Sequence, residues 1–339
     1  MIKIRIGLID VDGHHYPNLP LMKLSAWHKK QGDIVEWYDT EYPLLNPCYD
    51  KVYMSKVFSF TKDIEYPINA KEVIKGGSGY CIKLIDGKEV YDKTQEQELP
   101  YEVEHIYPDY SLYPEYTEDT AYGFLTRGCP RGCEFCHVKC KEGNKSYKVA
   151  NLSEFWRGQK NIILCDPNIL AYSGHMELLQ QLVDSRAKVN FNQGLDIRFI
   201  NKKNLDLLKQ IKLDGIHFAY DRYKDKCIIE HKMKAFKEAT GYDKDKGRVM
   251  VYILTNFNTT IEQDIERIQF CRSLRFSPYP MIYNKGEFVD RNGRLRPYSE
   301  LLKKFTIKQI DHFLKTQALQ RWCNNFIFWS TPTFDEYNC

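Results

Sequence analysis

A regular alternation of strand-sized apolar segments and helical patterns runs from about residue 120 to residue 283. We expect strands at Tyr122–Thr126, Asn161–Asp166, Val189–Gln193, Gly215–Tyr220, Val249–Leu254 and Tyr279–Tyr283. We expect helices between them at Glu154–Arg157, Met176–Asp184, Asn204–Lys212, Lys226–Ala239 and Thr260–Leu274, the last with a capping box of Thr259 and Glu262. This alternation predicts an α/β fold with a parallel sheet, either a partial (β/α)6 barrel of TIM type or an open doubly wound sheet.

Other regions flank this alternation. Residues 1–91 contain a strand, a helix and a second strand, at Ile2–Ile9, Leu19–Lys30 and Ile34–Tyr38, which predict a small Rossmann-like α/β domain. Residues 92–119 carry nine acidic side chains, one lysine, three prolines and five tyrosines, so we expect a linker that wraps over a surface. The barrel is expected over residues 120–298. A helical extension follows at 299–339, with a capping box of Thr306 and Gln309, and is expected to cover the barrel wall or bottom.

The composition is that of a soluble protein, with 43% hydrophobic and 28% charged residues. The longest apolar stretches, such as Val249–Leu254, are too short to span a membrane. Lys3, Arg5 and Asp10 interrupt the apolar run at the N-terminus, which argues against a signal peptide. We therefore expect a cytoplasmic protein without a membrane partner, whose 11 cysteines are free thiols, metal ligands or catalysts rather than disulfides.

Three of the cysteines lie together in the loop after the first predicted barrel strand. This loop reads RGCPRGCEFC over residues 127–136 and contains Cys129, Cys133 and Cys136. Its two glycines allow the backbone to turn tightly around whatever the sulfurs bind. A structural zinc ion would require a fourth ligand, for which His137 and Cys140 are the candidates. A 4Fe-4S cluster held by three thiolates would instead leave one iron open to a substrate or cofactor.

The spacing of these cysteines, with an aromatic residue just before the third, resembles the signature of the radical S-adenosylmethionine (SAM) enzymes. The resemblance makes Cys129, Cys133 and Cys136 the cluster ligands and places Phe135 near the adenine of SAM. It extends over nearly the whole chain, because residues 252–260, 280–283 and 321–325 look like a poorly characterised bacterial and phage branch of the superfamily. It implies an enzyme in which the cluster reductively cleaves SAM to a 5′-deoxyadenosyl radical that activates a C–H bond.

The resemblance also implies that the polar groups of SAM are met at the ends of the barrel strands. The candidate SAM contacts are Asp166, Asn168, Gln193, Asp196, Arg198 and Asn256. Arg198 is the natural partner for the SAM carboxylate, because a guanidinium group binds a carboxylate bidentately. The family's Gly-Gly-Glu after the second strand is absent, and Asp166-Pro167-Asn168 stands in its place. Recognition of the SAM amino group therefore has no direct match.

Residues 1–91 resemble a shortened form of the cobalamin-binding-like domain that precedes many radical SAM barrels. Gly76-Gly77 resembles its later glycine pair, but Asp12-Gly13-His14-His15 matches poorly the Asp-x-His-x-x-Gly element by which some members ligate cobalt. Several relatives bind cobalamin without that histidine. The residues of this chain favour a domain without bound cobalamin. The implied partner is a one-electron donor of the flavodoxin or ferredoxin type. The substrate stays open between a nucleic acid, a peptide and a small metabolite, and the reaction includes methyl transfer among its alternatives.

Charge supports a different class of function. The net charge is +4, but residues 92–119 contribute −8 (one basic against nine acidic side chains), so the rest of the chain carries 4 + 8 = +12. Lys303, Lys304, Lys308, Lys315 and Arg321 gather near the C-terminus. A basic surface is typical of nucleic-acid binding. The alternative is therefore a non-enzymatic nucleic-acid-binding protein stabilised by zinc or by a structural cluster.

Overall fold

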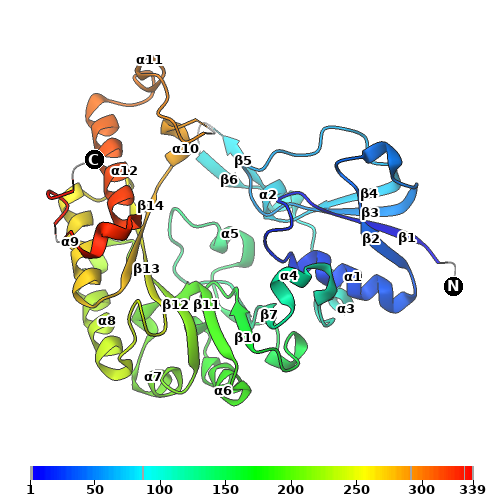
Figure 1. Ribbon diagram of the computed structural model, residues 1–339, viewed down its shortest axis with the longest axis horizontal. Helices are drawn as coiled ribbons and strands as arrows, with labels where there is room; N and C mark the ends of the chain where they lie inside the picture. Colours follow the sequence, from blue (N-terminus) through cyan, green and yellow to red (C-terminus); the bar gives the residue numbers. More distant parts are fainter. Residues whose placement is uncertain (1–2, 86–87, 291, 332, 338–339) are drawn as a thin grey trace.

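Two parallel sheets organise the chain in the computed structural model, which describes residues 3–85, 88–290, 292–331 and 333–337 (Figure 1). The four-stranded sheet near the N-terminus has the order β2-β1-β3-β4, and each neighbouring pair is parallel. The six-stranded sheet has the order β14-β13-β12-β11-β10-β7 and is also parallel throughout. The predicted α/β class with parallel sheets is confirmed.

The elements follow the chain in four groups. The first group comprises β1 (Arg5–Asp10), α1 (Leu19–Gln31), β2 (Ile34–Trp37), η1 (Pro43–Leu45), β3 (Tyr49–Ser55) and β4 (Ala70–Gly76). A hairpin and several short turns comprise α2 (Ser78–Cys81), β5 (Ile82–Ile85), β6 (Lys88–Tyr91), η2 (Lys93–Gln95), α3 (Tyr101–Glu104), η3 (Tyr110–Leu112) and α4 (Pro114–Thr117). The six-stranded sheet and its connections comprise β7 (Thr120–Gly123), β8 (Thr126–Arg127), α5 (Val138–Glu142), β9 (Tyr147–Lys148), η4 (Leu152–Glu154), β10 (Asn161–Leu164), η5 (Ile169–Ala171), α6 (His175–Ser185), β11 (Lys188–Leu195), η6 (Ile197–Phe199), α7 (Lys202–Leu208), β12 (Lys212–Ala219), η7 (Tyr223–Asp225), α8 (Lys226–Thr240), β13 (Val249–Thr255), α9 (Ile261–Ser273) and β14 (Ser277–Ile282). The last group comprises α10 (Lys285–Phe288), α11 (Tyr298–Leu301), α12 (Ile307–Asn324) and η8 (Phe326–Trp329).

The order of the six strands follows the chain without reversal. A doubly wound sheet reverses its strand order at a switch point and carries helices on both faces. Successive right-handed crossovers in one direction instead place every helix on the same face, and α6, α7, α8 and α9 lie along the outer side of the sheet (Figure 1). The doubly wound alternative is therefore wrong.

Side chains alternate between the two faces of each strand. The face toward the helices is apolar and fully buried, as at Val189, Ile216 and Val251, and it belongs to the main hydrophobic core. The opposite face has a different character, because it carries half-buried polar and aromatic side chains such as Asn192 and His217. The face toward the helices therefore carries the main core, whereas on the opposite face Tyr122 of β7 and Ile163 of β10 pack in a smaller cluster with Leu19 and Met22 of α1.

The structure corrects two local expectations and confirms a third. The helix expected at Glu154–Arg157 is the short turn η4, capped by Asn151. The capping box of α9 uses Thr260 and Gln263, one residue later than expected, because Thr260 has the extended backbone of a cap and accepts from the Gln263 amide. The helical extension is confirmed as α11 followed by α12, and the expected capping box of Thr306 and Gln309 starts α12.

The acidic segment before β7 packs tightly onto both sheets. The Tyr113 hydroxyl donates to the buried Asp10 carboxylate at the end of β1, at 2.7 Å. The Tyr110 hydroxyl donates to the carbonyl of Phe155 beside the second sheet, at 2.6 Å. Asp109 accepts from Ser25 and Lys29 of α1, each at 2.6 Å. The tyrosines and acidic residues of this segment thus join the N-terminal sheet to the six-stranded sheet.

Asp10→Asn is expected to change how stability depends on pH. Burial raises the pKa of Asp10 to about 6, above its ordinary value, so the folded state holds this proton more tightly than the unfolded chain. Such a group costs stability above its folded pKa, and the cost falls as the pH is lowered. The parent chain should therefore gain about 1 kcal/mol from Asp10 between pH 7 and pH 5. Urea unfolding at both pH values should show this gain in the parent and not in Asp10→Asn, which still accepts from Tyr113.

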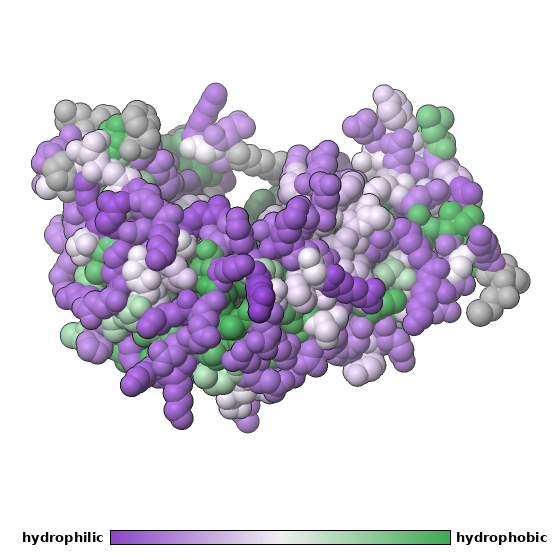
Figure 2. Space-filling view, turned by 60° about the horizontal axis from the view of Figure 1, so that its bottom comes forward, coloured by the Kyte–Doolittle hydropathy of each residue, from purple (hydrophilic) through white to green (hydrophobic). Residues whose placement is uncertain are grey.

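In the part of the chain that the structure describes, no helix is long and apolar enough to cross a membrane. The face in Figure 2 is mainly hydrophilic, with hydrophobic side chains in small separate groups.

α12 packs against β14 and α9, and the Gln320 side chain donates to the Pro280 carbonyl at 2.8 Å. The C-terminal helix therefore covers the edge of the six-stranded sheet.

Candidate functional site

The loop that carries the three cysteines is closed at its base by Glu142 of α5. One carboxylate oxygen accepts from the Arg127 guanidinium at 2.9 Å, and the other accepts from the Gly128 amide at 3.0 Å. Gly128 has a φ of +78°, and a Cβ there would lie 2.1 Å from the Lys145 carbonyl oxygen. Only glycine fits this crossing of the chain, which brings the start and the end of the loop together.

Asp166 anchors the loop to the sheet. Its carboxylate accepts from the amides of Leu125 and Thr126, at 3.1 and 2.5 Å, and from the Thr126 hydroxyl at 2.7 Å. The residue is 3% exposed, and burial raises its pKa to about 6. These bonds fix the turn that leads into Arg127. The geometry favours a positioning role for Asp166 over the SAM contact that we expected.

The three thiols lie close enough to influence one another. Burial raises the pKa of Cys133, with further contributions from Asp221 and Cys129, and burial also raises the pKa of Cys136, with contributions from the other two thiols. The Asn168 side chain, 2% exposed, donates to the Cys129 sulfur at 3.4 Å. Among the described residues, no three His, Cys, Asp or Glu side chains are arranged to hold a metal ion. The thiols therefore share one loop without forming a ready-made metal centre.

The donor set fits an iron–sulfur cluster better than a zinc ion. Three soft thiol donors stand on one loop, and the buried Asn168 amide donates to one of their sulfurs, as protein donors do around a cluster. Neither candidate for the fourth ligand of a zinc ion contacts the three thiols in the part of the chain that the structure describes. His137 bonds to Glu89 of β6 at 3.1 Å, and Cys140 is exposed on α5.

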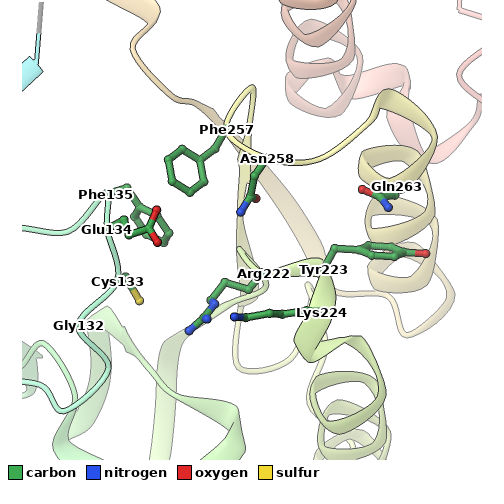
Figure 3. A pocket seen from close by; sticks show the side chains of 10 residues that line it. All are labelled: Gly132, Cys133, Glu134, Phe135, Arg222, Tyr223, Lys224, Phe257, Asn258 and Gln263. Atoms are coloured by element: carbon green, nitrogen blue, oxygen red, sulfur yellow. The ribbon is translucent and has the colours of Figure 1, made fainter.

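A cavity of about 300 Å³ opens beside the cysteine loop, at the ends of β12 and β13 (Figure 3). Its lining residues are Gly132, Cys133, Glu134, Phe135, Arg222, Tyr223, Lys224, Phe257, Asn258 and Gln263. The Phe135 ring meets Phe257 edge to face at 5.5 Å, and Phe257 meets Tyr283 at 4.8 Å. The cavity therefore has an aromatic wall on one side, to which Phe135 belongs.

Cations line the opposite wall of this cavity. Arg222 and Lys224 extend toward the side where Cys133 lies (Figure 3). Among the described residues, the guanidinium of Arg222 has one ion-pair contact, a long one of 3.9 Å with Asp225. Arg198, the expected partner of the SAM carboxylate, is instead engaged by Asp196 and Asp225. The structure thus offers Arg222, which the sequence analysis did not select, as the available guanidinium.

Asp196 also belongs to an internal network. Its carboxylate accepts from Arg198 at 2.7 Å and from Arg131 of the cysteine loop at 2.5 Å. Burial alone would raise the pKa of Asp196, but these two arginines hold it below its ordinary value. Asp196 therefore ties the middle of the cysteine loop to the end of β11.

Gln193 and Asn256 are the two remaining expected SAM contacts. Gln193 is exposed near the end of β11. Asn256 donates to the Tyr283 carbonyl at 3.1 Å and has a left-handed backbone, with a φ of +59°. Neither of them lines the cavity, whereas their neighbours along the chain, Phe257 and Asn258, do.

Sequence reasoning missed the groups that position the loop. Glu142 and Arg131 act through partners far from them in sequence, which no local motif indicates. Asp221 and Arg222 directly follow a predicted strand. The rule that ligands bind at the carboxyl ends of parallel strands could therefore have identified them. The Asp221 carboxylate accepts from the Leu254 amide at 2.9 Å, and burial raises its pKa to about 6.

Comparisons with known proteins add information on the fold. No protein-family model and no curated protein sequence matches the chain. Among solved structures, the chain is similar to the radical S-adenosylmethionine methyltransferase TsrM from Kitasatospora setae, solved with its tryptophan substrate and the SAM analog aza-SAM. The TM-score is 0.58 at 13% sequence identity, and the match covers 83% of this chain and 73% of that chain. The likeness shows that this chain shares its fold with a radical SAM methyltransferase.

Proposed function

We propose that the chain is a radical SAM enzyme in which Cys129, Cys133 and Cys136 bind a 4Fe-4S cluster. The observation that carries this proposal is that three thiols stand on one closed loop beside a cavity, at the carboxyl ends of a six-stranded parallel sheet. The fold shared with TsrM supports it. We also propose that the six β/α units over residues 120–298 form a partial barrel, preceded by a domain over residues 1–91 and the linker 92–119.

The chain's own residues would hold the two cofactors in distinct ways. When bound, the cluster and SAM supply a 5′-deoxyadenosyl radical that abstracts hydrogen from the substrate. Phe135 and Phe257 would contact the adenine, because flat rings pack favourably against each other. Arg222 would hold the SAM carboxylate in place of Arg198. Asp166, Asp196 and Glu142 position the loop through their bonds to its residues.

The proposed cofactors are the cluster and SAM, with bound cobalamin as the less favoured addition. In the loop after β1, the His14 ring packs against Trp37 at 4.1 Å, and the N-terminal sequence lacks the cobalt-ligating element. Reduction of the cluster requires a one-electron donor, for which a flavodoxin or ferredoxin is the proposed partner. The net reaction is proposed to be the modification of a C–H bond.

Cofactor loading tests this proposal. After anaerobic reconstitution with iron and sulfide, the full chain should contain about four irons and four sulfides and become brown. The measurement is an iron and acid-labile sulfide assay on the desalted protein. A chain that takes up one zinc and no sulfide under the same conditions would contradict the proposal and support the zinc alternative.

Arg222→Ala is expected to weaken SAM binding by about tenfold or more, because a charge-assisted hydrogen bond contributes about 1.5–3 kcal/mol. Equilibrium dialysis of the reconstituted protein with SAM measures this change. Arg321→Ala is the matched control, since Arg321 lies exposed on α12 and contacts Gln317. Equal affinities of Arg222→Ala and the parent would remove Arg222 from the site.

A further inference from the structure

The face of the six-stranded sheet that turns away from the helices carries a row of uncharged polar and aromatic side chains. Asn192 of β11, His217 of β12, Tyr252 of β13 and Tyr279 of β14 share this face, and we call them the aromatic face. The rings of His217 and Tyr252 are stacked at 5.2 Å with an interplanar angle of 8°, and Tyr252 meets Tyr279 edge to face at 5.8 Å. Tyr279 is 40% exposed, so the row is accessible at that end.

His217 presents a hydrogen-bond acceptor. Its Nδ1 lies 2.9 Å from the Phe191 carbonyl oxygen, which only accepts, so Nδ1 carries the hydrogen. Burial lowers the pKa of His217 below its ordinary value, although the bond to Phe191 acts in the opposite direction. The lowered pKa keeps the ring neutral near pH 7. Nε2 is then an acceptor, and it has no hydrogen-bond partner within the described ranges of the chain.

Asn192 adds a second acceptor. Its Nδ2 donates to the Tyr16 hydroxyl at 3.0 Å, while its backbone carbonyl accepts from the Tyr252 hydroxyl at 3.3 Å. The donors of this side chain therefore point to Tyr16, and its Oδ1 has no partner in the part of the chain that the structure describes. Asn190, two residues earlier on the same face, has a buried Oδ1 without any partner among the described residues. The face offers acceptors and lacks charge.

The aromatic face leads toward the candidate site. Asn192 of β11 precedes Asp196, which follows the end of that strand and bonds to Arg131 of the cysteine loop. Tyr252 of β13 is likewise followed, beyond the end of that strand, by Phe257 of the cavity wall. Tyr16 covers the start of the face from the N-terminal part of the chain and is itself 51% exposed.

We propose that the aromatic face binds the reacting part of the substrate, which is an uncharged, planar nitrogen heterocycle whose ring N–H donates to Nε2 of His217. The inference rests on the proposed function, since it names the substrate class of the same site. Flat rings match Tyr16 and Tyr279, and a ring N–H is the donor that the unpartnered acceptors require. A charged group would find no counter-charge among the four side chains of the face.

Binding of a pair of small probes to the full reconstituted chain tests this inference. Indole has the planar ring and the N–H, and 1-methylindole keeps the ring without the N–H. Ligand-observed NMR titration, with and without SAM, should give saturable binding of indole and about tenfold weaker binding of 1-methylindole. Equal affinities for the two probes, or no saturable binding of indole, would overturn the inference.

Variants place the probe on the face. His217→Phe keeps a flat ring and removes the acceptor, so it should weaken indole to the level of 1-methylindole and leave 1-methylindole itself unchanged. The matched control is His231→Phe on α8, where the histidine is exposed, and its affinities should equal those of the parent. An indole affinity that His217→Phe leaves unchanged would contradict the assignment. If the chain cleaves SAM but fails these tests, the proposed substrate class alone is contradicted. If the chain binds indole but releases no 5′-deoxyadenosine, the proposed function is contradicted.

Discussion

Cys133→Ala is expected to lose the iron–sulfur cluster and to reduce SAM cleavage by more than about 100-fold, because even changes in the second shell of a metal site cost about 10–100-fold. Cys133 lies on the closed loop and is the one of the three cysteines among the residues that line the cavity. The measurements are the iron and sulfide content after reconstitution and the rate of 5′-deoxyadenosine release.

The same loop supplies a matched control. Cys140 is four residues after Cys136 and is exposed on α5. Cys140→Ala should therefore keep the full iron and sulfide content and the parental rate. If Cys140→Ala loses metal as completely as Cys133→Ala does, four thiols hold the metal and the position that SAM needs is closed.

Arg267→Leu is expected to destabilise the chain by about 3–5 kcal/mol, the cost of breaking a buried ion pair on one side. The Arg267 and Asp264 side chains of α9 are both 0% exposed and paired with each other. The Arg267 guanidinium also donates to the Tyr220 carbonyl at 2.5 Å and to the Leu254 carbonyl at 2.9 Å. Its loss leaves a buried carboxylate and two strand-end carbonyls without their donor.

Urea unfolding measures this loss of stability, and Arg5→Leu is the control. Arg5 pairs with Glu36 at 3.2 Å with both side chains about 40% exposed, so its removal should cost less than about 1 kcal/mol. A cost of less than 1 kcal/mol for Arg267→Leu would contradict the role given to this buried pair. Because Tyr220 is followed by Asp221 and Arg222, Arg267→Leu should also weaken SAM binding under conditions where the variant is folded.

The sequence predicted the parts of the fold that are written in local patterns. Apolar alternation located the strands of the second sheet, and the glycine-rich cysteine loop was recognised from ten consecutive residues. The capping box at Thr306 was correct, but at α9 two adjacent threonines offered two possible starts and backbone conformation selected Thr260. The choice between a doubly wound and a singly wound sheet depended on strand order, which local patterns do not contain.

The candidate site was harder to predict because several side chains that could bind a ligand pair with one another in the folded chain. Arg198 and Asp196 are suitable SAM contacts by type, but they bond to each other, to Asp225 and to Arg131. Such pairings depend on distances across loops that only the folded chain determines. Arg222 is available for the same reason, since its neighbour Asp225 is already engaged by Arg198.

The central claim is that the cysteine loop holds a cluster that cleaves SAM, and one measurement tests it most directly. The reconstituted chain is reduced anaerobically in the presence of SAM, and 5′-deoxyadenosine is quantified by liquid chromatography for the parent and for Cys129→Ala. The account predicts release by the parent, dependent on reductant, and none by Cys129→Ala. Equal release by both proteins, or none by a parent that contains its full iron and sulfide, would contradict it.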